Sequence, residues 1–208
     1  MKSTRVPSLF HWNVYQPERR IDFNSFFWAS ESGGVLIDPM PASAATEEFV
    51  LAQGGATSVV LTNADHLRAT ERWKELTGAR VFAPRAESSA LSKHEGLVDD
   101  WFEQDGQLPA PIGASIQAFP LRGGKSPGEV ALYIPSLRAL VFGDAVRSHD
   151  SGAFRLLPDG KITDRAQLAR DVRGLRDLNA EVYLLGDGDS FFWAGRSAFL
   201  NFLRDLSD

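Results

Sequence analysis

Short runs of apolar residues separated by turn residues fill the first part of the chain. Runs rich in β-branched and aromatic residues favour strands, and the pattern predicts strands at 8–14, 23–29 and 35–37. The string Glu31-Ser32-Gly33-Gly34 lies between the last two. Paired glycines adopt positive φ without steric cost, so we expect a hairpin there.

Further along the chain, predicted helices alternate with predicted strands. Apolar residues at helical spacing indicate a helix, and we expect helices at 45–52, 66–76, 164–178 and 193–206. Further strands are expected at 57–62, 80–83, 115–121, 129–134, 139–142 and 182–185. The stretch 87–106 favours neither type. Strand-rich halves with interleaved helices indicate an α/β protein with two helix-covered sheets rather than one doubly wound sheet.

Composition narrows the class of protein. A chain of 208 residues, 43% of them hydrophobic, suits one folded domain spanning 1–208. The net charge of −5 argues against nucleic-acid binding, which needs a clustered basic surface. No apolar run is long enough to cross a membrane, and the N-terminal residues lack the apolar core of a secretory signal. The chain has no cysteine, which excludes disulfides and thiolate ligands. We expect a cytoplasmic protein.

Four stretches resemble, in order, the motifs of the metallo-β-lactamase superfamily. Residues 24–39 look like its opening hairpin, and Val59 to His66, VVLTNADH, resembles the strand that leads into its T-H-x-H-x-D-H motif. Residues 126–144 are similar to its H-T-P-G-S strand pair and the G-D that follows, and 184–188 resembles its late G-H-G loop. The resemblance covers roughly 23–190. It implies a four-layer αββα sandwich.

The departures from the family pattern concern its metal ligands. The family typically holds two metals with five histidines and two aspartates, whereas this chain has four histidines, of which only His66 lies in a motif. A two-residue gap after Thr62 would align Asp65 and His66 with the family's Asp-His pair. Without the gap, Leu67 and Arg68 fall on ligand positions. We prefer the gapped alignment because it keeps two ligands.

On this alignment, the resemblance implies that the first-metal site is lost. Asn63 and Lys125 take the places of two of its histidines, and a third position is deleted. The remaining candidate metal ligands are Asp65, His66, Asp144 and Asp187. Three carboxylates and one imidazole favour magnesium, manganese or iron relative to a histidine-rich zinc site. We expect one divalent metal at most, with zinc as the fourth candidate.

Each candidate ligand also has a structural interpretation. Asp65 suits the cap of the helix expected at His66, and His66 itself suits an ordinary surface or core position. Asp144 and Asp187 lie beside glycines, where turn aspartates are common. If the carboxylates converge, a pair near 4 Å repels by about 4 kcal/mol. Such a cluster must bind a cation, pair with Lys125 or an arginine, or raise a carboxylate pKa.

Two functions remain open at this stage. The first is a metal-dependent hydrolase with one metal at the four candidate ligands, where the ion lowers the pKa of a water. Lys125 or Asn63 would then polarise the substrate or stabilise an oxyanion. The second is an inactive superfamily member that serves as a small-molecule binding or interaction domain, with Lys125 paired to Asp144. Arg68 and Arg147 lie beside the motifs and are close enough in sequence to reach the pocket.

Overall fold

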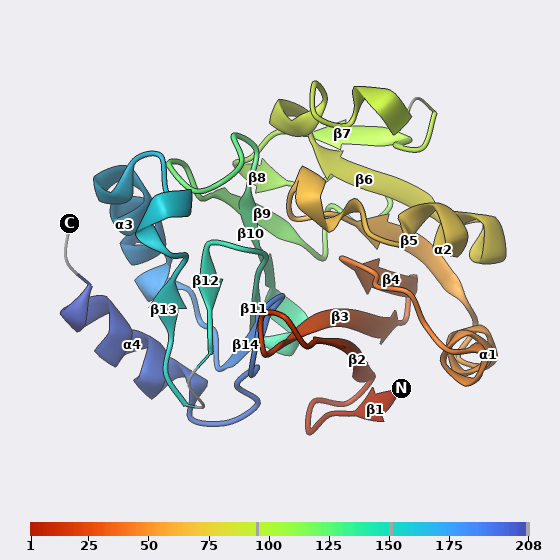
Figure 1. Cartoon of the computed structure of the whole chain (residues 1–208). Helices are drawn as coiled ribbons and strands as arrows, with labels where there is room; N and C mark the ends of the chain where they lie inside the picture. The colour runs from red at the N-terminus through yellow and green to blue at the C-terminus, as the bar shows by residue number, and fades with distance from the viewer. Residues whose placement is uncertain (95, 150–151, 207–208) are drawn as a thin grey trace.

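Two facing sheets with helices on their outer faces make up the computed structural model, which describes residues 1–94, 96–149 and 152–206 (Figure 1). One sheet has the order β1 (Lys2–Ser3), β2 (Leu9–Gln16), β3 (Ile21–Ser30), β4 (Gly33–Ile37), β5 (Ala56–Val60), β6 (Arg80–Pro84), β7 (Asp100–Phe102). The other has the order β14 (Val182–Leu185), β11 (Ala139–Phe142), β10 (Val130–Ile134), β9 (Gln117–Pro120), β8 (Gly106–Gln107). A small ribbon pairs β12 (Val146–Arg147) with β13 (Arg155–Leu156).

The helices lie in two pairs. The first pair, α1 (Ala44–Ala52) and α2 (Thr70–Thr77), packs on the seven-stranded sheet. The second pair, α3 (Arg165–Gly174) and α4 (Gly195–Asp205), packs on the five-stranded sheet. The order of layers is therefore helix, sheet, sheet, helix, which confirms the expected αββα architecture (Figure 1).

Three apolar layers hold these four layers together, and β10 shows how. Alternate residues of a strand point to opposite faces. Val130, Leu132 and Ile134 pack between the two sheets, whereas Ala131 and Tyr133 pack under the second pair of helices. Strands covered on both faces need apolar residues at nearly every position, which is why β10 is a continuous apolar run.

Most predicted elements are present, but the helix predicted at 66–76 begins later. The chain instead forms a 3-10 turn, η1 (Ala64–Leu67), and α2 starts at Thr70. Arg68 separates them with φ 42 and ψ −115. The residue that caps the turn is Asn63, whose Oδ1 accepts from the backbone N of His66 at 3.1 Å. The interpretation of Asp65 as the cap is therefore wrong.

The stretch that favoured neither type of structure holds short pieces of both. It begins at the last residue of the 3-10 turn η2 (Arg85–Glu87), includes the 3-10 turn η3 (Ser92–His94) and β7, and ends at the first residue of β8. Further 3-10 turns are η4 (Pro135–Leu137), η5 (Asp159–Lys161) and η6 (Leu175–Asp177).

None of the helices in the described ranges has the length and apolar character that a membrane span requires.

Candidate metal centre

A pocket of about 440 Å³ lies where loops from both sheets meet. Strands β4 and β5 are parallel to each other, and so are β11 and β14. The loops that follow the two strands of each pair therefore leave their sheet at the same end. Ligand sites commonly form at the carboxyl ends of such strands. The walls include Asp65, His66, Lys125, Asp144 and Asp187. Five residues that the sequence singled out therefore do share one pocket.

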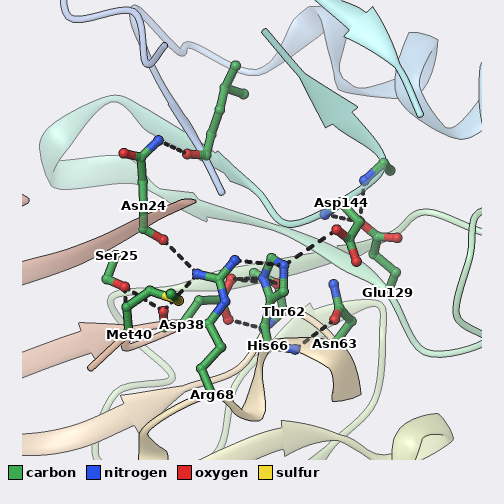
Figure 2. A network of polar contacts seen from close by, with 12 residues as sticks. Asn24, Ser25, Asp38, Met40, Thr62, Asn63, His66, Arg68, Glu129 and Asp144 are labelled. Carbon is green, nitrogen blue, oxygen red and sulfur yellow. Dashed lines mark hydrogen bonds and ion pairs between the residues drawn. The ribbon is translucent and has the colours of Figure 1, made fainter. Parts of the chain in front are cut away.

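His66 is held in place by a buried carboxylate. Its Nδ1 lies 2.7 Å from Oδ2 of Asp38 (Figure 2). Asp38 also accepts from the backbone N and the Oγ1 of Thr62, at 2.8 and 2.6 Å. All three residues are buried. Because Nδ1 is engaged with Asp38, the ring presents Nε2 to the pocket.

Three side chains converge on one point in the pocket. His66, Asp144 and Asp187 each offer a ligand atom, and these atoms lie within 4.8 Å of one another. Oδ2 of Asp144 is buried and has no hydrogen-bond partner in the described part of the chain. Asp65 is not a member of this group. The structure thus contains a candidate three-residue metal-binding group, which we call the ligand triad.

Buried neighbours position the two aspartates of the triad. The backbone N–H groups of Asp144 and Ala145 donate to Oε1 of Glu129 at 2.8 and 2.6 Å, and Glu129 is fully buried. Figure 2 shows Glu129 beside Asp144. Asp187 Oδ2 lies 3.3 Å from Nη2 of Arg147. Each aspartate is therefore supported by a residue that is not itself a candidate ligand.

The fold and the site agree with what similarity to known proteins shows. The model of the metallo-β-lactamase superfamily matches residues 1–206. The chain belongs to the metallo-β-lactamase superfamily. The expected family assignment is confirmed.

Solved structures of superfamily members share the fold at low sequence identity. The metallo-β-lactamase from Pontibacter korlensis is 18% identical, with 98% of this chain and 97% of that chain covered and a TM-score of 0.75. The DIM-1 metallo-β-lactamase is 17% identical over 96% of both chains, with a TM-score of 0.71. An enzyme of the same name from Erythrobacter litoralis is 15% identical, covering 97% and 89%, also with a TM-score of 0.71. No curated protein matches the chain.

The surroundings of the triad shift the pKa values of its two aspartates in opposite directions. Burial alone would raise the pKa of Asp144, but His66, Lys125 and Arg68 outweigh it and hold the pKa well below its usual value. Burial and the charge of Asp144 raise the pKa of Asp187. Asp144 is therefore the more firmly charged carboxylate of this superfamily member's triad.

Two neighbours compete for Nε2 of His66. Burial and the charge of Arg68 lower the pKa of His66, whereas Asp38 and Asp144 outweigh them and raise it to about 9. A proton on Nε2 would point to Oδ1 of Asp144, 3.6 Å away. Nη2 of Arg68 is closer, at 3.0 Å, and a guanidinium can only donate. The contact with Arg68 therefore favours an unprotonated Nε2 and opposes the protonation of the ring that the two carboxylates favour.

The mouth of the pocket carries an ion pair that we call the rim pair, Asp65 and Lys125. Lys125 Nζ contacts Oδ2 of Asp65 and lies 3.6 Å from Oδ2 of Asp144. Burial lowers the pKa of Lys125, but the two carboxylates raise it above its usual value. The second hypothesis predicted the contact between Lys125 and Asp144, and the structure contains it.

Asn63 does not line the pocket and is fully buried.

Sequence reasoning missed two residues that organise the site and left two others undecided. Asp38 was seen only as part of the hairpin motif, although its place between a strand end and Pro39 was a usable signal. Glu129 follows the Pro-Gly turn, but no sequence feature marked its carboxylate as buried. Arg68 and Arg147, noted only as neighbours of the motifs, both contact triad residues.

Donor chemistry decides whether a divalent metal, which the superfamily typically binds, suits this pocket. A ligating histidine almost always donates its other N–H to a carboxylate or carbonyl, and the contact of His66 with Asp38 satisfies this condition. Oδ2 of Asp144 accepts no hydrogen bond in the described part of the chain, and only the charge of Lys125, at 3.6 Å, faces it, so it can accept a cation. The triad therefore fits a divalent cation, while the Arg68 contact opposes it.

Proposed function

We propose that this protein is a metal-dependent hydrolase that binds one divalent cation at His66, Asp144 and Asp187. The observation that carries the proposal is the convergence of these three ligand atoms within 4.8 Å. The contact between Asp38 and His66 supports it, because such a partner fixes the ring and raises its basicity as a ligand. Two carboxylates and one imidazole favour magnesium, manganese or iron over zinc.

The chain's own residues have distinct parts in this reaction. A divalent cation, when bound, supplies Lewis acidity and lowers the pKa of a water. Lys125 offers a positive charge 3.6 Å from Asp144, at the pocket mouth, where it suits an oxyanion that develops on the substrate. Asp65 orients Lys125 through the rim pair. Asn63 acts indirectly, because its side chain holds the turn that presents His66.

A second function has an observation of its own in its favour. Around the pocket, Asp65, Asp144 and Asp187 are each within ion-pair distance of Lys125 or Arg147. A site whose carboxylates already face cations can be a stable structural element without a metal. On this alternative the protein is an inactive superfamily member that binds a small molecule or a partner.

Metal binding by the purified protein separates the two functions. After dialysis against a chelator, the protein is equilibrated with Mn²⁺, Fe²⁺, Mg²⁺ or Zn²⁺, and bound metal is measured by mass spectrometry. The hydrolase requires about one equivalent of one of these ions, abolished in Asp144→Ala. Asp105→Asn, an exposed position, is the control and should bind normally. Sub-stoichiometric metal that Asp144→Ala leaves unchanged contradicts the hydrolase and favours the inactive binding domain.

A further inference from the structure

Arg68 lies in a strained backbone position between η1 and α2. Its φ of 42 falls in the left-handed region, which residues with a side chain rarely adopt. Such strain persists only where the surroundings hold it in place. The contacts of the Arg68 side chain therefore indicate why the chain keeps an arginine here.

Those contacts hold the guanidinium at the base of the pocket. Nη1 donates to the backbone oxygens of Asn24 at 2.7 Å and Asp38 at 3.1 Å. The guanidinium carbon lies 5.7 Å from the centre of the Phe23 ring, within cation–π range. Figure 2 shows the guanidinium between Asn24 and His66. Two carbonyls and a ring thus fix one orientation.

In this orientation the second guanidinium nitrogen meets the ligand triad. Nη2 donates to Nε2 of His66 at 3.0 Å. The Nδ1 atom is already engaged with Asp38 at 2.7 Å, so Nε2 carries the ring's only lone pair free for a metal. One lone pair cannot serve both a donor and a metal, and an arginine side chain does not lose its proton.

We infer that Arg68 competes with the metal for the lone pair of Nε2 of His66 and so determines how tightly the ligand triad binds a divalent cation. This inference rests on the proposed function. Binding of the metal requires the guanidinium to leave Nε2, and its positive charge opposes the ion as long as it stays nearby. The wild-type protein therefore binds metal weakly, and removal of the guanidinium strengthens binding.

The test is calorimetric titration of the metal-free protein with Mn²⁺ and, separately, Zn²⁺. Arg68→Met removes the charge and the donors, and we expect it to bind at least one of these ions roughly 10-fold tighter or more. Arg72→Met is the matched control, because Arg72 lies on α2, is 56% exposed and pairs with Glu47 instead. It should bind as the wild type does.

A second variant keeps the test decisive if Arg68→Met does not fold. Arg68→Gly also removes the guanidinium, and glycine adopts positive φ without strain, so the turn is retained. Tighter binding in either folded variant, lost again when His66→Ala is added, supports the inference. Stoichiometric binding that is equal or weaker in the folded variants overturns it and leaves the proposed function intact. No binding of Mn²⁺ or Zn²⁺ by wild type or variants overturns the inference, and the proposed function is overturned as well only if Mg²⁺ and Fe²⁺ also fail to bind.

Discussion

The base and the mouth of the pocket both contain charged or titratable side chains, but the two regions differ in how far these side chains are exposed to water. At the base, Asp38 and His66 are buried and face fixed partners. At the mouth, the side chains of Lys125 and Asp65 are 35% and 51% exposed. A buried charge is costly unless it is paired and hydrogen-bonded, whereas water screens an exposed pair. The base of the pocket therefore specifies the structure, and the mouth remains free to contact ligands.

The largest expected effect on stability comes from the base of the pocket. Asp38→Ala removes the acceptor of Thr62 and of Nδ1 of His66, and breaking such a buried pair costs about 3–5 kcal/mol. Urea unfolding followed by circular dichroism measures it. The control is Asp65→Ala in the rim pair, which should cost less than about 1 kcal/mol. Equal losses in the two variants would remove the distinction between base and mouth.

The pH dependence of stability tests the base at a second residue. Burial and the charge of Asp144 raise the pKa of Glu129 from 4.5 to about 8. The folded protein therefore keeps a proton that the unfolded chain releases, and its stability falls as pH rises from about 4.5 toward 8.

Glu129→Gln stays neutral at every pH, so it should gain stability relative to the wild type across this range, by about 2–4 kcal/mol. Urea unfolding of both proteins at pH 5 and pH 8.5 provides the measurement. A difference that is the same at both pH values contradicts a raised pKa.

The smallest expected effect on stability is at the mouth. Lys125→Met should cost less than about 1 kcal/mol, because exposed ion pairs contribute little. Lys74→Met is a matched control, since Lys74 forms a similarly exposed pair with Asp99. If the proposed function holds, only Lys125→Met lowers hydrolytic activity. A stability loss far above that of the control would instead assign Lys125 a structural role and support the inactive binding domain.

Regular parts of the fold could be read from the sequence because local pattern and final environment agree. β11 and β14 occur at the predicted residues, since a strand buried on both faces is a continuous apolar run. The prediction was wrong at the start of α2. The side chain of Asn63 caps the start of a separate 3-10 turn through its contact with the backbone N of His66, and Arg68, with a positive φ, follows the end of that turn. Periodicity carries no signal of either.

The sequence by itself determined the layered architecture, the family and three residues that converge at the site. Those features depend on which residues are apolar and on motifs that the chain keeps in order. Only the tertiary structure decided what surrounds His66. Asp38 lies 28 residues away in the chain, and it reaches His66 because the parallel strands β4 and β5 bring the loops that follow them together. Arg68 is only two residues away, and it contacts Nε2 from a backbone position with a positive φ. That packing determines whether each charged side chain of the pocket contacts a carboxylate, a cation or water.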